Sequence, residues 1–187
     1  EITAFNEGTP EEFKAAIDDL NDQGMKGIIF DLRYNGGGLV KSCTEMMDYV
    51  LPEGVTVYTV TKDGKKTEYT SDATSHVDVP VVVLTSNYTA SASEIFTGAI
   101  RDFEYGTIIG TKTFGKGIVQ GTIELRDGSA VQITTEKYYT PKGECIHGKG
   151  IEPDIELEYN YSGDTSASEY DYYADNQIQK ALEVLVH

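Results

Sequence analysis

The sequence predicts one mixed α/β domain, in which buried strands alternate with helices and β-hairpins are added. Short, continuous apolar runs are typical of buried parallel strands, and other segments carry apolar residues at a helical period. Asp-Gly pairs between runs of β-branched residues predict tight hairpin turns. The length of 187 residues suits a single domain with a sizeable core.

In chain order, residues 9–51 predict a helix, a strand, a glycine-rich turn and a second helix. Thr9 is the expected N-cap of the first helix, with Pro10 in its first turn and Glu12 completing a capping box. The apolar run "KGIIFDLRY" predicts the buried strand, "NGGG" the turn, and "LVKSCTEMMDYVL" the second helix.

The rest of the chain continues this alternation. Two hairpins are expected, turning at Asp63-Gly64 and at Asp127-Gly128. The runs "VPVVVLTSNY" and "GTIIGTKTFG" predict buried strands, and a helix begins near Ser91 between them. An acidic, Tyr-rich connection over 156–174 then leads to an amphipathic helix over 175–186.

The charge balance argues against several classes of partner. With 31 acidic and 15 basic residues, the net charge is -16, which repels phosphate backbones and anionic lipids. No apolar run approaches the roughly 20 residues needed to cross a bilayer. Because the chain begins with Glu1, we expect a piece of a longer protein, with any peripheral membrane association made through other segments.

The cysteines and histidines show no metal-binding spacing, so no metal site is expected. Cys43 and Cys145 are expected to be free thiols. The histidines are His76 in a polar loop, His147 in a glycine-rich loop and the terminal His187.

Three short segments rich in glycine or small residues follow the expected strands. Ligands usually bind at the carboxyl ends of parallel strands. The segments are Asn35–Gly38, Ser91–Glu94 and Gly115–Gly117. Each also has a structural interpretation, as a strand-to-helix connection, a helix cap and an exposed turn. Ser91 and Glu94 have the capping-box spacing, and spacing does not exclude Ser93 as an alternative nucleophile.

A serine hydroxyl needs a base before it attacks, and a lysine can serve when it is uncharged. Free lysine titrates near 10.4, so working near pH 7 takes a fall of about three units, which costs about 4 kcal/mol. Lys116 lies between two glycines, and Gln120, four residues on, shares its side of a strand or a helix. A Ser–Lys dyad with a backbone oxyanion hole is chemically coherent.

Four motifs occur in one order: "GIIFDLRYNGGGLV", "NYTASASEIFTGAIRDF", "GTKTFGKGIVQ" and "YYTPKGECIHGKGIEPDI". Together they resemble the carboxy-terminal processing peptidases, also called tail-specific proteases, from about Ile2 to Ile155. The resemblance implies a crotonase/ClpP-like α/β core and a serine endopeptidase without metal or organic cofactor. Its expected substrates are proteins with unstructured, apolar C-terminal tails, bound in extended form.

By this resemblance Ser91 is the nucleophile, Lys116 the general base and Gln120 its supporting residue. The backbone N–H groups of Ala92 and Gly37 are the expected oxyanion hole. Other motif residues have structural interpretations: Glu94 as capping partner, Asp31 and Arg33 as an ion pair, and Asp102 and Thr113 as supports of the site.

The resemblance also bears on organisation and location. Residues 1–187 are expected to form one peptidase core, with the motifs in 1–155, the connection over 156–174 and the helix over 175–186. The family usually carries a PDZ module before this core, and nothing in the chain matches one. An extracytoplasmic location in a bacterial envelope is implied, whereas the oligomeric state is not.

Two other functions stay open at this point. The same fold family includes retinoid-carrying modules that bind apolar ligands without proteolysis, although a pure binder has no need of Ser91, Lys116 and Gln120 together. A crotonase-like acyl transfer on thioesters would need a nucleotide-binding patch, which the net charge disfavours.

Overall fold

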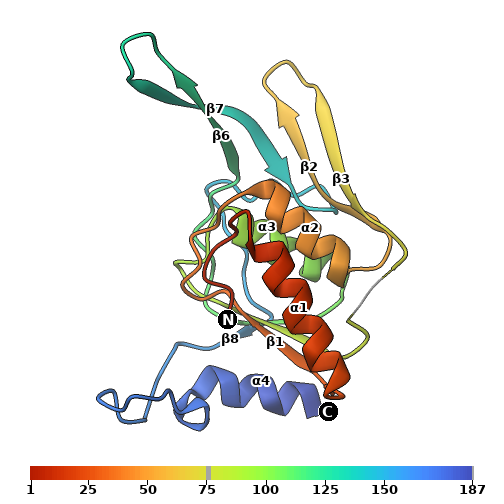
Figure 1. Cartoon of the computed structure of the whole chain (residues 1–187), viewed down its shortest axis with the longest axis vertical. Coiled ribbons are helices and arrows are strands. Elements are labelled where there is room, and N and C mark those ends of the chain that lie inside the picture. The colour runs from red at the N-terminus through yellow and green to blue at the C-terminus, as the bar shows by residue number, and fades with distance from the viewer. Residues whose placement is uncertain (75–76, 187) are drawn as a thin grey trace.

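The computed structural model describes residues 1–74 and 77–186, and its strands form a parallel and an antiparallel sheet (Figure 1). The parallel sheet has the order β1-β4-β5-β8. Its strands are β1 (Ile28–Asp31), β4 (Val81–Thr85), β5 (Thr107–Gly110) and β8 (Ile155–Glu156). The mixed α/β class predicted from the sequence is confirmed, with parallel and antiparallel pairing in separate sheets.

Helices cover both faces of the parallel sheet. Figure 1 shows α1, α2 and α3 on one side and α4 on the other. Their bounds are α1 (Thr9–Asp22), α2 (Val40–Val50), α3 (Ala92–Asp102) and α4 (Asn176–Val186), with a 3-10 turn η1 (Tyr172–Ala174) before α4. Because both faces are covered, every residue of β4 is buried.

The side chains of β4 alternate between two apolar clusters. Val81 and Val83 belong to the larger cluster under α1–α3, whose aromatic centre includes Phe30 and Phe96 in edge-to-face contact at 5.3 Å. Val82 and Leu84 join a smaller cluster against α4, which also contains Ile109, Ile178 and Ala181. The final amphipathic helix expected from the sequence therefore packs back on the core.

The antiparallel sheet consists of two hairpins that project from the core, away from α4 (Figure 1). Its order is β3-β2-β7-β6, which leaves β6 at an edge. The strands are β2 (Gly54–Thr61), β3 (Lys66–Ser71), β6 (Ile118–Glu124) and β7 (Ala130–Tyr139). Both hairpins turn at the predicted Asp-Gly pairs, closed by backbone hydrogen bonds from Thr61 to Lys65 and from Leu125 to Ser129.

The predicted N-cap of the first helix is wrong by one residue. Gly8, not Thr9, is the N-cap of α1. The Thr9 hydroxyl is engaged by the preceding turn, since it accepts from the Asn6 N–H (3.0 Å) and donates to the Ala4 carbonyl (3.1 Å). Within 1–74 and 77–186, no helix is both long and apolar enough to span a bilayer.

Candidate active site

The carboxyl ends of β1, β4 and β5 lie at one edge of the parallel sheet, and the three short segments follow them. Their loops are joined by hydrogen bonds. The Ala90 N–H donates to the Asn35 carbonyl (3.1 Å), and the Phe114 N–H donates to the Thr89 carbonyl (3.0 Å). The three segments therefore lie together at the carboxyl ends of the strands, as the sequence predicts.

Ser91 sits at a sharp turn between β4 and α3. Its φ of 59° and ψ of -119° lie outside the helical and extended regions, an uncommon conformation for a residue with a side chain. A strained serine between a strand and a helix is the geometry that presents a nucleophile at the top of a sheet. Ala92 follows as the first residue of α3, where backbone N–H groups favour negative charge.

Gly37 lies directly against this turn. A Cβ on Gly37 would come within 2.8 Å of both the Ala90 carbonyl oxygen and the Ser91 Cβ, and its φ of 106° favours glycine. Its N–H donates to Asn35 Oδ1 at 2.8 Å. The two predicted oxyanion-hole residues, Gly37 and Ala92, are thus neighbours, with the Gly37 N–H directed at Asn35.

Glu94 connects the turn of Ser91 to the turn of Lys116. Its fully buried carboxylate accepts four hydrogen bonds, two at each oxygen. Oε2 accepts from the N–H groups of Ser91 (2.9 Å) and Lys116 (2.8 Å). Oε1 accepts from the Thr113 hydroxyl (2.6 Å) and the Gly115 N–H (2.7 Å). The capping box is present, but Glu94 also ties both candidate catalytic residues to one carboxylate.

Lys116 is half-buried and lines a groove of about 700 Å³ beside the turn of Ser91, next to Ala90. Gln120 is exposed on β6, next to an irregularity in its pairing with β7. Among the described residues, no hydrogen bond joins the side chains of Ser91, Lys116 and Gln120. The structure thus brings Ser91 and Lys116 together through their main chains and leaves Gln120 at the edge strand.

The alternative serine occupies a different environment. Ser93 is fully buried, and its hydroxyl donates to the Asn35 carbonyl at 2.9 Å. Cys43 is also fully buried, and its thiol donates to the Ala92 carbonyl at 3.2 Å. Burial raises the pKa of Cys43, which keeps the group a neutral thiol. Both cysteines are free, as the sequence predicts.

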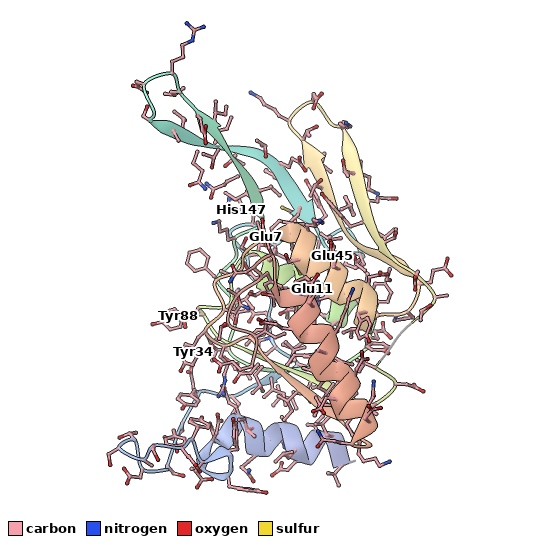
Figure 2. The ribbon with its side chains drawn as sticks, in the orientation of Figure 1. Glu7, Glu11, Tyr34, Glu45, Tyr88 and His147 are labelled. Atoms are coloured by element: carbon pink, nitrogen blue, oxygen red, sulfur yellow. The ribbon has the colours of Figure 1, made fainter. Side chains whose placement is uncertain are left out.

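The histidines contribute little to this edge. His147 is exposed at the base of the β6–β7 hairpin (Figure 2), where its backbone packs against Gly117. His76 and His187 lie outside the described residues. In the described part of the chain, no three His, Cys, Asp or Glu side chains form a group that could hold a metal ion.

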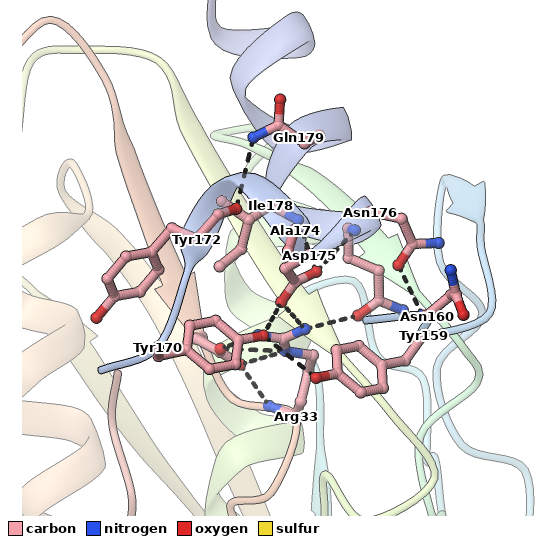
Figure 3. Close-up of polar contacts among 12 residues, drawn as sticks. Arg33, Tyr159, Asn160, Tyr170, Tyr172, Ala174, Asp175, Asn176, Ile178 and Gln179 are labelled. Carbon is pink, nitrogen blue, oxygen red and sulfur yellow. Dashed lines mark hydrogen bonds and ion pairs between the residues drawn. The ribbon is translucent and has the colours of Figure 1, made fainter. Parts of the chain in front are cut away.

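Asp31 and Arg33 form an ion pair, at 2.6 Å, as the structural interpretation expects. The pair extends to α4, because Arg33 Nη1 contacts Asp175 at 2.7 Å (Figure 3). Burial opposes the charge of Arg33, but the carboxylates of Asp31 and Asp175 outweigh it and raise its pKa. Asp102 lies at the far end of α3, where it accepts from the Lys142 N–H (2.8 Å).

Exposed apolar side chains surround the candidate site. Tyr34 and Tyr88 lie side by side, with ring centroids 6.1 Å apart (Figure 2). Leu39 and Phe114 are also exposed, and each of these residues flanks one of the three loops. The spacing arguments identified none of the four, although all four lie within the quoted motifs, which is a signal that could have found them.

Known proteins match this chain over most of its length. The model of peptidase family S41 matches residues 1–157. A carboxyl-terminal-processing protease of Synechocystis sp. is 40% identical over 184 residues, which cover 98% of this chain and 42% of that protein. A Staphylococcus aureus protein named "Probable CtpA-like serine protease" is 41% identical over 161 residues, covering 84% of this chain and 32% of that protein.

The fold is shared with solved structures as well. A photosystem II D1 C-terminal processing protease superposes with a TM-score of 0.79 at 37% identity, covering 84% of this chain and 41% of that one. This chain thus spans less than half the length of each of these three proteins. The resemblance drawn from the four motifs is confirmed: the chain belongs to peptidase family S41.

Proposed function

We propose that this chain is the catalytic core of a serine endopeptidase that cleaves proteins near their C-termini. The observation that carries the proposal is the shared carboxylate of Glu94, which holds the strained Ser91 and the turn of Lys116 side by side. Family membership adds support, because the named relatives are proteases. No named relative supports the ligand-binding alternative.

In the proposed mechanism, Ser91 Oγ attacks the carbonyl carbon of the scissile bond while the uncharged Lys116 amine accepts its proton. The lysine then returns this proton to the leaving amine, and a water molecule, activated in the same way, hydrolyses the acyl-enzyme. Gln120 would support the lysine once substrate draws the edge strand β6 toward the site. Catalytic hydrogen bonds often tighten only when substrate is bound.

The negative charge on the substrate oxygen would be stabilised by the N–H groups of Ala92 and Gly37. The N-terminus of α3 adds a favourable partial positive charge. Since the Gly37 N–H donates to Asn35 Oδ1, this role requires that the turn share or release that hydrogen bond.

The surroundings of the site support unstructured, apolar tails as substrates. Tyr34, Leu39, Tyr88 and Phe114 offer apolar surface around Ser91. Strand β6 begins two residues after Lys116 and lies at a sheet edge, so an extended peptide could pair with it while it passes the dyad. An extracytoplasmic site of action in a bacterial envelope is part of the proposal and rests on the family resemblance.

The test is cleavage of an unstructured protein with an apolar C-terminal tail by the wild type, Ser91→Ala and Lys116→Ala, between pH 6 and 10. We expect cleavage that rises with pH, because the base must lose its charge, and loss of activity in both folded variants. Ser93→Ala, which removes the neighbouring hydroxyl, is the matched control and should retain cleavage.

Either of two results would reject the assignment. Cleavage that survives Ser91→Ala rules out the nucleophile. Absence of cleavage by this chain, and by any longer form of the protein that contains it, rules out the peptidase.

A further inference from the structure

Tyr138 is buried at the base of the β6–β7 hairpin, and its hydroxyl reaches the candidate site. Its side chain is 1% exposed and its ring belongs to the larger apolar cluster. The hydroxyl donates its single proton to a bifurcated hydrogen bond, shared between the Ser91 carbonyl oxygen, at 3.0 Å, and the Lys116 carbonyl oxygen. Tyr138 is the first residue of the motif "YYTPKGECIHGKGIEPDI", but the sequence analysis assigned it no role.

Glu94 and Tyr138 hold the same pair of residues, and we call the contacts of the Tyr138 hydroxyl with the Ser91 and Lys116 carbonyl groups the brace. Glu94 Oε2 accepts from the N–H groups of Ser91 and Lys116, and the Tyr138 hydroxyl faces the carbonyl groups of the same two residues. One buried side chain, Glu94, therefore holds the N–H groups of the candidate nucleophile and the candidate base, and a second, Tyr138, holds their carbonyl groups.

We propose that Tyr138 is a positioning residue, whose hydroxyl fixes the Lys116 main chain against Ser91 so that the lysine amine stays within reach of the nucleophile. This inference rests on the proposed peptidase function. Tyr138 would not touch the substrate, because its hydroxyl is occupied by the two carbonyl groups.

The effect should fall mainly on Lys116. The Ser91 carbonyl also accepts from the N–H groups of Glu94 (2.9 Å) and Ile95 (3.1 Å), so helix α3 holds it without help. In the described part of the chain, the Lys116 carbonyl has the Tyr138 hydroxyl as its hydrogen-bond donor and no other. Burial raises the pKa of Tyr138, so the hydroxyl keeps its proton and remains a donor across the working range.

The fold ties this brace to the hairpin. The Tyr138 N–H donates to the Gly117 carbonyl at 3.2 Å, so the same residue also holds the peptide that follows Lys116. Next along β7, Tyr139 points to the other face of the sheet and stacks on Tyr58, with ring centroids 5.1 Å apart. Tyr139 is therefore a matched control: the same residue type on the same strand, with its side chain directed away from the site.

The experiment compares Tyr138→Phe with Tyr139→Phe, each of which loses one hydroxyl and keeps its ring. For Tyr138→Phe we expect kcat to fall about 10- to 100-fold while KM changes less than about threefold, because a misplaced catalytic group impairs the chemical step more than binding. Tyr139→Phe should match the wild type.

Amide hydrogen exchange measures how firmly the Lys116 main chain is held, and it does not depend on activity. Peptides that cover Lys116 and Gly117 should exchange faster in Tyr138→Phe than in Tyr139→Phe, whereas peptides of α3 should not. Wild-type kcat and wild-type exchange in Tyr138→Phe would overturn the proposal, even if its melting temperature falls. If the wild type cleaves nothing, the failure lies with the proposed function, and exchange still decides whether the brace exists.

Discussion

Two buried carboxylates, Glu94 and Asp175, occupy comparable positions in this molecule and differ in what they hold. Each lies at the N-terminus of a helix that packs on the parallel sheet. Glu94 accepts only from neutral donors: three backbone N–H groups and one hydroxyl. Asp175 pairs with the Arg33 cation, accepts from the Tyr170 hydroxyl and caps α4 through the N–H groups of Gln177 and Ile178.

The difference indicates two separate tasks. Because all its donors are neutral, Glu94 holds the loops of Ser91 and Lys116 together without placing a second cation near the lysine amine. The charged partner of Asp175 comes from the loop after β1, 142 residues away in sequence, so this contact anchors the C-terminal helix to the sheet (Figure 3). We therefore expect Glu94 variants to lose activity first and Asp175 variants to lose stability first.

The largest expected effect is that of Glu94→Gln. A glutamine has one acceptor oxygen, so its amide group would face two hydrogen-bond donors that the second carboxylate oxygen now accepts. We expect kcat to fall about 100-fold, because the turns of Ser91 and Lys116 shift, and the free energy of unfolding to fall by about 2–4 kcal/mol. Steady-state kinetics and denaturant unfolding measure both.

The control for this variant is Glu45→Gln on α2, whose exposed carboxylate lies 3.6 Å from Lys41. It should change neither quantity. Wild-type kcat in Glu94→Gln would contradict the role given to Glu94.

Asp175→Asn should invert this pattern. It removes one of the two carboxylates that balance the buried Arg33, leaving Asp31 as the remaining partner. A buried cation is costly when it loses part of its compensating negative charge, so we expect the free energy of unfolding to fall by about 2–4 kcal/mol. The kcat measured below the melting temperature should stay within about threefold of the wild type, since the loops of Ser91 and Lys116 are held elsewhere. A large loss of kcat in the folded variant would erase the distinction between the two carboxylates.

The same carboxylate predicts a pH dependence. Burial by itself would raise the pKa of Asp175, but hydrogen bonds from Tyr170 and Arg33 outweigh it and lower this pKa. Its contribution to stability is therefore fully present above the unfolded value of about 3.9 and is lost as pH falls below it, through the folded pKa. The stability difference between wild type and Asp175→Asn should shrink from pH 5 to pH 2.5. A difference that stays constant over this range would contradict the assignment.

Tyr170→Phe should have the smallest effect. Its hydroxyl donates to Asp175 Oδ2 at 2.7 Å and is hydrogen-bonded to the Tyr159 hydroxyl at 3.2 Å, and the residue is 42% exposed. Loss of the hydroxyl should lower the free energy of unfolding by about 0.5–1.5 kcal/mol. Tyr173→Phe, whose side chain is 81% exposed, is the control and should leave stability unchanged. Equal effects of the two variants would remove Tyr170 from the anchor.

The sequence predicted the elements better than the contacts between them. Apolar runs and Asp-Gly turns located β1, β4, β5 and both hairpins, because strand burial and turn chemistry are local properties. The two-residue strand β8 was missed, since a strand of that length has no period to detect. The cap of α1 was misplaced because Thr9 satisfies the preceding turn instead of the helix.

The candidate site shows the same division. The spacing of Ser91 and Glu94 predicted the capping box, which is a local feature. The bonds from Glu94 to Thr113, Gly115 and Lys116 join residues far apart in sequence, and no pattern within one segment encodes them. Tyr138 was missed for the same reason, because its hydroxyl reaches the site only after β7 pairs with β6.

The central claim, that Ser91 is a nucleophile activated by Lys116, is tested most directly by covalent labelling. The wild type, Lys116→Ala and Ser93→Ala would be treated with a serine-directed phosphonylating probe, and the modified residue identified by peptide mass analysis. We predict labelling at Ser91 in the wild type and in Ser93→Ala, with a rate at least about 100-fold lower in Lys116→Ala. Labelling at Ser93, or equal rates with and without the lysine, would contradict the account.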